Sequence, residues 1–122
     1  MAGGLRVVEA GGCVDEVELE ARVEAVCPVT GIVDVYRLML RYTPPRSARG
    51  CRYLEALSVH DYLAGFRGIK ILQEELAARI AEEVCRALGG GLVRVTLEGS
   101  HGPVAMRVTA ARSCGEPGEA EG

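Results

Sequence analysis

A strict two-residue alternation between Val17 and Val26 constrains the fold of this chain more than any other feature of its sequence. Apolar side chains occupy every second position of this segment, and charged side chains stand between them: Glu18, Glu20, Arg22 and Glu24. Successive side chains of a β-strand point to opposite faces of the sheet. The alternation therefore predicts a strand with one buried face and one face in water.

Three further segments carry the pattern of β-strands. The four strands form two pairs, and a turn that contains Gly and Pro connects the two strands of each pair. The three further strands are expected at 33–42, 92–97 and 104–110. The turn between the first two strands is 27–31 and the turn between the last two is 99–103, because Pro removes a backbone donor and Gly permits a tight turn. Each pair is expected to be antiparallel.

The middle of the chain is expected to be helical. Apolar positions favour a short helix at about 54–64, and apolar residues at i, i+3 and i+4 predict a longer helix at about 69–88. The glycine run 89–91 ends the longer helix. The segment 46–52 holds three arginines and is expected to be a short polar loop.

The order of these elements is strand, strand, helix, helix, strand, strand. This order predicts an α+β fold, in which an antiparallel four-stranded sheet carries two helices on one face. The edges of such a sheet are open, and open edges pair with other chains. We therefore expect a homo-oligomer that closes several sheets into a barrel.

The length of 122 residues corresponds to one domain, expected at 1–112, followed by a disordered acidic tail at 113–122 that is rich in Gly and Glu. No run approaches the roughly 18 apolar residues of a membrane helix. Residues 1–12 hold one Arg and no long apolar stretch, which argues against a secretory signal. A soluble, cytoplasmic protein is expected.

The charge balance is mildly acidic, with 14 Lys+Arg against 17 Asp+Glu and a net charge of −3. This is not the charge of a protein that binds nucleic acid by bulk electrostatics. A local strip of arginines could still contact phosphates, and a solvated arginine-rich loop is an equally good interpretation. The strip consists of Arg41, Arg46, Arg49 and Arg52.

The five cysteines are an odd number, so a disulfide framework is not expected in a reducing compartment. No C-x-x-C pair occurs, and His60 and His101 have no ligand-like spacing to a cysteine, so no metal site is expected. Cys85 falls in the longer helix near apolar positions and is assigned to the core. Three other cysteines, Cys13, Cys51 and Cys114, are expected in loops or in the tail.

Cys27 is the best candidate nucleophile. It ends the first strand, and Asp34 follows it by seven residues at the start of the second strand. If the two strands form a hairpin, thiol and carboxyl can face each other across its mouth. A thiolate is a strong nucleophile and a nearby carboxyl can exchange its proton. The alternative is a packed, inert thiol, which is common for cysteine.

Glu74 and Glu75 lie early in the longer helix, away from the apolar side marked by Leu72 and Leu76. One interpretation is a solvated helix face. The other is that a carboxylate near the helix N-terminus pairs with the N–H edge of a guanine-like ring.

These residues carry a family resemblance. The segment 27–34, Cys-Pro-Val-Thr-Gly-Ile-Val-Asp, resembles the signature of the QueF nitrile oxidoreductases, which reduce 7-cyano-7-deazaguanine and have the tunnelling fold (T-fold). Glu55, the pair Phe66-Arg67 and the segment 71–74 keep register with further motifs of that family. The resemblance spans residues 23–84.

Two departures distinguish the chain from the reductases. Leu57 and His60 stand where the reductases carry lysines that engage NADPH phosphates, and no Gly-rich dinucleotide motif is present. With these departures, and in the stretch from Phe66 to Leu76, the chain is similar to the short crenarchaeal QueF-like archaeosine synthases. Gln73 stands where both groups usually have histidine, and an amide supplies no proton.

The resemblance to the QueF-like group implies a reaction on the nitrile of 7-cyano-7-deazaguanine in the D-loop of tRNA, with ammonia as co-substrate, no NADPH and no metal. Cys27 would form a thioimide and Asp34 would protonate the nitrogen. Substrate binding would fall to Leu54, Glu55, Ala56, Gln73 and Glu74. Relatives with this fold imply a pentamer or decamer. A nitrile reductase that uses NADPH and a non-catalytic protein that binds deazaguanine or tRNA remain the alternatives.

Overall fold

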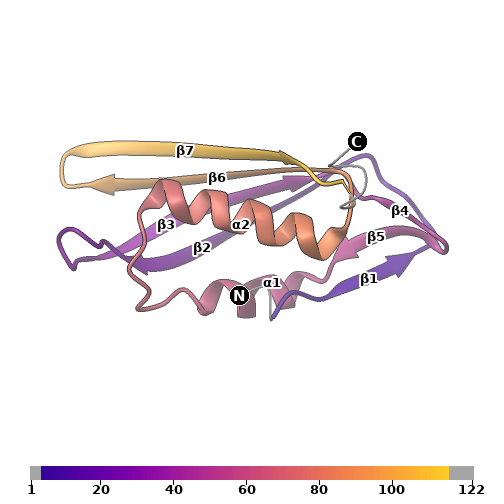
Figure 1. The fold of residues 1–122 in the computed structure, drawn as a ribbon, viewed down its shortest axis with the longest axis horizontal. Coiled ribbons are helices and arrows are strands. Elements are labelled where there is room, and N and C mark those ends of the chain that lie inside the picture. Colours follow the sequence, from indigo (N-terminus) through magenta and orange to yellow (C-terminus); the bar gives the residue numbers. More distant parts are fainter. Residues whose placement is uncertain (1–3, 116–122) are drawn as a thin grey trace.

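A computed structural model describes residues 4–115 of the chain as two layers, a sheet and a pair of helices (Figure 1). The helices and strands follow in this order: β1 (Val7–Ala10), β2 (Val17–Val26), β3 (Val33–Tyr42), β4 (Arg46–Ser47), β5 (Gly50–Leu54), α1 (Ala56–Ala64), α2 (Gln73–Leu88), β6 (Leu92–His101) and β7 (Val104–Ser113).

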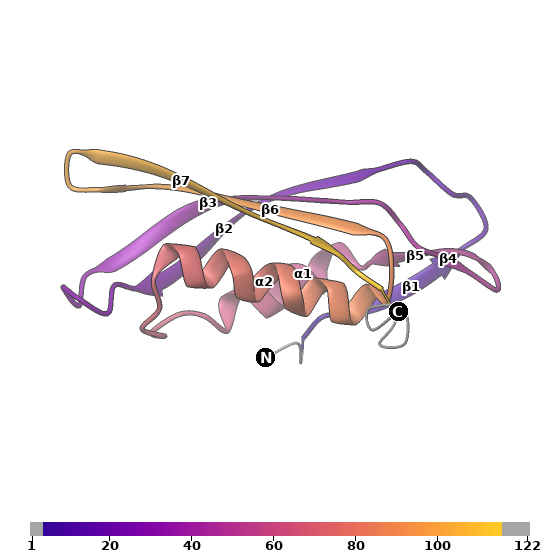
Figure 2. The same ribbon diagram turned by 45° about the horizontal axis from the view of Figure 1, so that its top comes forward.

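The main sheet has four antiparallel strands in the order β2-β3-β6-β7. Both helices cover the same face of this sheet, as the turned view shows (Figure 2). The predicted α+β class, the four-stranded sheet and the helical layer are therefore confirmed. Strands β2 and β3 have the predicted bounds, because their alternation and the Pro- and Gly-containing turns are local signals.

A second, three-stranded sheet in the order β1-β5-β4 was not expected. The prediction of a polar loop at 46–52 is wrong, because the chain there forms the β4–β5 hairpin and β5 pairs with β1 from Val7↔Leu54 to Ala10↔Cys51. Gly50, at φ 131°, lies so close to Ala10 that a Cβ would clash with the Ala10 carbonyl. A short strand whose partner is about forty residues away has no local signature.

The hairpin of β6 and β7 is longer than predicted. The turn expected at 99–103 shrinks to Gly102 and Pro103, and His101 is the last residue of β6, paired with Val104. Gly102 has a φ of 61°, which a two-residue hairpin turn favours. His101 therefore has a fixed place in the sheet instead of a place in a loop.

Helix α2 begins at Gln73 and not at residue 69, because the residues before it pair with β2. Val26 N–H donates to the Ile69 carbonyl at 2.9 Å, and Ile71 N–H donates to the Val26 carbonyl at 3.0 Å. These bonds fix the N-terminus of α2 beside the end of β2, one residue before Cys27.

The apolar face of α2 packs on the main sheet and forms the core with it. Leu76, Ile80 and Val84 of α2 are almost fully buried, as are the inward residues of β3 and β6. These sheet residues are Tyr36, Leu38, Leu40, Tyr42, Val93, Val95 and Leu97. The outward residues of β2 and β3 carry the charges, including ion pairs of Arg37 with Glu20 and Glu98.

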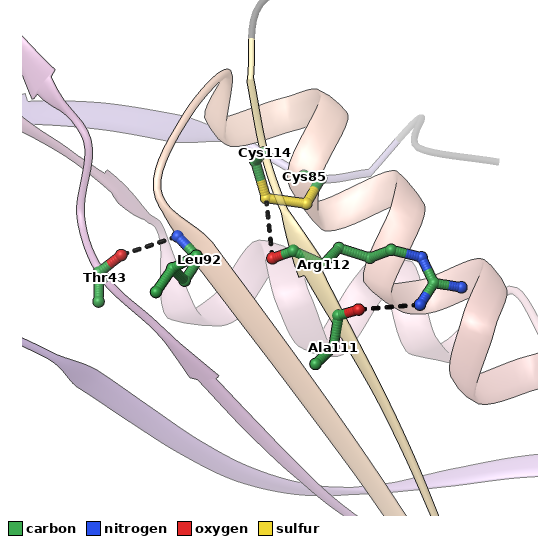
Figure 3. Close-up of a disulfide and its surroundings, with 6 residues drawn as sticks. All are labelled: Thr43, Cys85, Leu92, Ala111, Arg112 and Cys114. Carbon is green, nitrogen blue, oxygen red and sulfur yellow. Dashed lines mark hydrogen bonds between the residues drawn. A yellow bond between two sulfur atoms is a disulfide. The ribbon is translucent and has the colours of Figure 1, made fainter. Parts of the chain in front are cut away.

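The expectation that the chain holds no disulfides is wrong. Cys13 is joined to Cys51 and Cys85 to Cys114, with Cα–Cα distances of 5.5 and 5.0 Å. Figure 3 shows the second disulfide linking α2 to the chain after β7, close to the hydrogen bond from Leu92 N–H to Thr43 Oγ1. The strand pairing that brings these cysteines together cannot be read from their spacing.

The C-terminal boundary of the domain lies later than the predicted residue 112. Ser113 belongs to β7, and Cys114 is buried and bonded to Cys85. Residues 116–122, the rest of the tail expected to be disordered, lie outside the described residues. Among residues 4–115, no helix is both long enough and apolar enough to cross a membrane.

Loss of a disulfide is expected to destabilise the protein. The two bonds span sequence separations of 38 and 29 residues, and the loop-entropy estimate for such lengths is about 3–4 kcal/mol each. The free energy of unfolding, measured by urea denaturation, should fall by about this amount in Cys85→Ser. Cys27→Ser is the matched control, since it removes a cysteine that is in no disulfide. An equal effect of the two substitutions would contradict the prediction.

Candidate active site

Cys27 is held in a tight loop between β2 and β3. Its N–H donates to the Ile32 carbonyl, and its carbonyl accepts from Gly31 N–H, both at 2.9 Å. Gly31 has a φ of 75°, a left-handed conformation that favours glycine. The loop therefore presents the thiol at a fixed position at the end of the hairpin.

The Cys27 thiol is free, partly exposed and activated. All five cysteines of the chain lie in the described part, and the other four form the two disulfides. Hydrogen bonds from the Thr30 hydroxyl, and from the backbone at Thr30 and Val29, lower the pKa of Cys27, although burial and the charge of Asp34 oppose this shift. A lowered pKa gives more thiolate, which is the nucleophilic form.

Asp34 lies on β3, opposite Ala25 of β2 and close to the thiol. Its Oδ2 accepts a hydrogen bond from the Tyr36 hydroxyl at 3.1 Å. Tyr36 is only 2 % exposed, and burial, followed by the charge of Asp34, raises its pKa far above the usual range. Tyr36 therefore stays protonated and holds the Asp34 carboxylate in place.

Cys27 and Asp34 line one hollow of about 180 Å³, together with the start of α2 and the end of the β6–β7 hairpin. These elements meet at the same end of the molecule (Figure 1). The other residues of its lining are Pro28, Tyr36, Ile71, Leu72, Gln73, Glu74, His101 and Met106. Cys27 and Asp34 thus line the same hollow at the end of the β2–β3 hairpin.

A larger hollow of about 400 Å³ lies elsewhere on the main sheet, beside Glu16, Arg41 and Arg94. It contains no cysteine or histidine. The smaller hollow, which Cys27 and Asp34 both line, is therefore the candidate active site.

Gln73 is 2 % exposed and lies at the first position of α2. Its amide nitrogen donates to the carbonyls of Leu97 and Met106 at 3.0 and 3.1 Å, and its Oε1 lies 2.8 Å from His101 Nε2. Both amide hydrogens are therefore occupied by the sheet. Its predicted contact with the substrate stays a prediction.

His101 belongs to this site, although the sequence assigned it to a turn. Its Nδ1 lies 3.9 Å from Asp34 Oδ2, and its ring is 6.2 Å from that of Tyr36. The alternation of β6, extended beyond Leu97, was the signal that could have placed it there.

Glu74 is exposed at the second position of α2 and lines the hollow, as a base-binding carboxylate would. Leu54, Glu55 and Ala56 lie at the β5–α1 junction and do not line it. The Glu55 carboxylate caps α1 by accepting from Leu57 N–H and Ser58 N–H at 2.7 and 2.9 Å. Within one chain these three residues are therefore not brought to Cys27.

The arginine strip does not form a single surface. Arg46 and Arg49 lie on the β4–β5 hairpin, at the other end of the molecule from the Cys27 loop (Figure 1). Arg52 donates to the Ala87 carbonyl at the end of α2, and Arg41 pairs with Glu16 and Glu18. In the described part of the chain, no group of three His, Cys, Asp or Glu side chains could hold a metal ion.

No protein-family model matches the sequence. The archaeosine synthase of Pyrobaculum calidifontis is 32% identical over 97 residues, which cover 77% of this chain and 82% of the relative. This similarity decides the family. The chain belongs to the QueF family, which includes the archaeosine synthases of the QueF-like type. The expected resemblance is thereby confirmed.

Other members of the QueF family agree with this assignment. The NADPH-dependent 7-cyano-7-deazaguanine reductase of Thermotoga maritima is 31% identical over 94 residues, which cover 76% of this chain and 66% of the reductase. This chain thus spans slightly less than two thirds of the reductase. The crystal structure of a QueF-like archaeosine synthase in the apo form matches with a TM-score of 0.75 and 30% identity, over 87% of this chain and 100% of that chain.

Removal of the Thr30 hydroxyl is expected to make Cys27 less reactive. Thr30→Val deletes the largest contribution to the lowered pKa of Cys27, so the thiolate fraction at neutral pH falls. Alkylation by iodoacetamide at pH 7, followed by intact mass without reductant, should slow severalfold, and the difference should vanish at high pH. Thr109→Val on the exposed face of β7 is the control. Equal rates in both variants would count against activation by Thr30.

Proposed function

We propose that this protein is an archaeosine synthase, which converts the nitrile of 7-cyano-7-deazaguanine in tRNA into a formamidine with ammonia. The observation that carries the proposal is the activated Cys27 thiol in one hollow with the fixed Asp34 carboxyl. The 82% coverage of the Pyrobaculum enzyme supports it. No organic cofactor and no metal take part, and the reaction belongs to the cytoplasm, where tRNA is modified.

The first step is the addition of Cys27 to the nitrile. The thiolate sulfur forms a bond to the nitrile carbon, and one electron pair of the C≡N bond moves to the nitrogen. Asp34, which takes up the thiol proton as Cys27 ionises, gives this proton to that nitrogen, and a neutral thioimide results. Nucleophilic catalysis of this kind divides one difficult addition into two easier ones.

The second step replaces sulfur with nitrogen. Ammonia bonds to the thioimide carbon, a proton passes from the incoming nitrogen to the imide nitrogen, and the C–S bond then breaks with its electron pair returning to Cys27. The product is the amidinium, and the Cys27 thiolate regains its proton from solvent. No hydride is transferred, so no reductant is needed.

Recognition of the deazaguanine base requires more than the residues of one chain. The hollow of about 180 Å³ is smaller than the roughly 300–1,000 Å³ of common ligand pockets. Glu74 offers a carboxylate to the N–H edge of the base, while Leu54, Glu55 and Ala56 would approach from another subunit. Strands β2 and β7 are open edges, which supports a homo-oligomer, a pentamer or decamer, that closes the sheets into a barrel.

The second candidate is an NADPH-dependent nitrile reductase, which the 31% identity to the Thermotoga enzyme favours. Such an enzyme must fix the NADPH phosphates. Leu57 and His60, at the positions of the reductase lysines, lie exposed on α1 and offer no permanent charge. Oxidation of NADPH in the presence of free 7-cyano-7-deazaguanine would favour the reductase.

Cys27→Ala is expected to abolish both the thioimide and the product. Wild-type protein incubated with 7-cyano-7-deazaguanine should gain the mass of one base and lose it on addition of ammonium. The variant should gain none, and amidine formation on tRNA should fall by several orders of magnitude. Thr109→Val, on the exposed face of β7 and outside the hollow, is the control. Binding of the base without a covalent adduct in the wild type would indicate a non-catalytic protein instead.

The exposed arginines of the β4–β5 hairpin are expected to contribute to tRNA binding. Arg46→Ala and Arg49→Ala should each reduce the slope of log K against log salt by about one unit, because each phosphate contact releases counterions. Arg41→Ala is the matched control, since Arg41 already pairs with Glu16 and Glu18. Filter binding at several salt concentrations measures the slopes, and slopes unchanged from the wild type would remove the hairpin from the interface.

A further inference from the structure

We infer that His101 is the base of the ammonia step, held by Gln73 so that its Nδ1 lone pair faces the hollow opposite Asp34. The inference rests on the proposed function. It assigns the proton transfer of the ammonia step to His101, a residue that the sequence analysis had placed in a turn. It is carried by the hydrogen bonds of Gln73, the place of His101 at the end of β6 and the lining of the hollow.

Gln73 fixes which nitrogen of His101 carries the proton. The carbonyls of Leu97 and Met106 can only accept hydrogen bonds, so the Gln73 atom that faces both of them is the amide nitrogen. The atom that faces His101 is then Oε1, which also only accepts. His101 Nε2 must therefore donate, and in neutral His101 the lone pair lies on Nδ1.

The Nδ1 lone pair points to where the reaction takes place. Nδ1 lies 3.9 Å from Asp34 Oδ2, and a carboxylate has no proton to donate to this lone pair. The charged and titratable groups that surround the hollow are Cys27 in the loop, Asp34 and Tyr36 on β3 and Glu74 on α2. All of them are neutral or negative, so a proton taken up by His101 is stabilised there.

The second step of the reaction requires a base that takes a proton from the incoming nitrogen. When ammonia bonds to the thioimide carbon, the incoming nitrogen becomes positive and must lose one proton, which His101 Nδ1 accepts. His101 then passes this proton to the imide nitrogen, and the C–S bond breaks with its electron pair returning to Cys27. Asp34 Oδ2 is already hydrogen-bonded to the Tyr36 hydroxyl, and imidazole is the side chain that most often serves as a general base.

The tautomer can be tested without any substrate. The chain has two histidines, so nitrogen NMR of ¹⁵N-histidine-labelled protein needs only His60→Gln to assign the signals. At alkaline pH, His101 should show a protonated Nε2 and an unprotonated Nδ1. The opposite tautomer, or an equal mixture, would overturn the inference whatever the enzyme activity.

The role in the reaction is tested with His101→Gln, whose amide can still donate to Gln73 Oε1. The thioimide should form within about twofold of the wild-type rate, while its conversion by ammonium at pH 7 should slow on the order of 10²–10³-fold. The wild-type conversion rate should depend on pH through this base, and His101→Gln should lose this dependence. Intact mass at timed intervals follows both steps.

His60→Gln is the matched control, because His60 lies exposed on α1, 3.5 Å from Asp61, and outside the hollow. Conversion of the thioimide by His101→Gln at the wild-type rate, with the wild-type pH profile, would overturn the inference and leave the proposed function intact. Failure of the wild type to form a thioimide would overturn the proposed function, and with it the base role of His101. The thermal midpoints of the variants show whether a slow variant is folded.

Discussion

Two main-chain hydrogen bonds hold the start of α2 against the end of β2, and the site depends on them. Val26 donates to the Ile69 carbonyl and accepts from Ile71 N–H. Val26 precedes Cys27, and Ile71 stands two residues before Gln73, so this pairing joins the loop that holds the thiol to the N-terminus of α2. Without it, Cys27 and Asp34 would remain neighbours on one hairpin, but neither Gln73 nor Glu74 would be brought over them.

The polar side chains of the site are held from both sides by the core. Tyr36 is anchored in the sheet and holds Asp34, while Gln73 is buried under the hairpin of β6 and β7 and orients His101. The reactive groups are therefore positioned by residues that cannot move without loss of core packing. Groups fixed in this way need little reorganisation during a reaction.

The sequence predicted those parts of the fold that have local signals. The alternation of β2, the turn at 27–31 and the helical spacing of α2 identified the main sheet, the helical layer and the pair Cys27 and Asp34. It missed β1 and β5, because their pairing joins segments far apart in the chain, and it missed the disulfides for the same reason. It missed β4 because a strand of two residues is too short to show an alternation. His101 was missed because a Gly- and Pro-rich stretch resembles a long turn, although only Gly102 and Pro103 form one.

The disulfides have a consequence for the sensitivity of Cys27 to oxidants. An activated thiolate that is partly exposed reacts readily with peroxide and becomes a sulfenic acid. In many redox-regulated proteins a second thiol of the same chain then condenses with it and protects it. Here the other four cysteines are already bonded to one another. Only a thiol from outside the chain can rescue oxidised Cys27, and in its absence oxidation continues to the irreversible sulfinic and sulfonic acids.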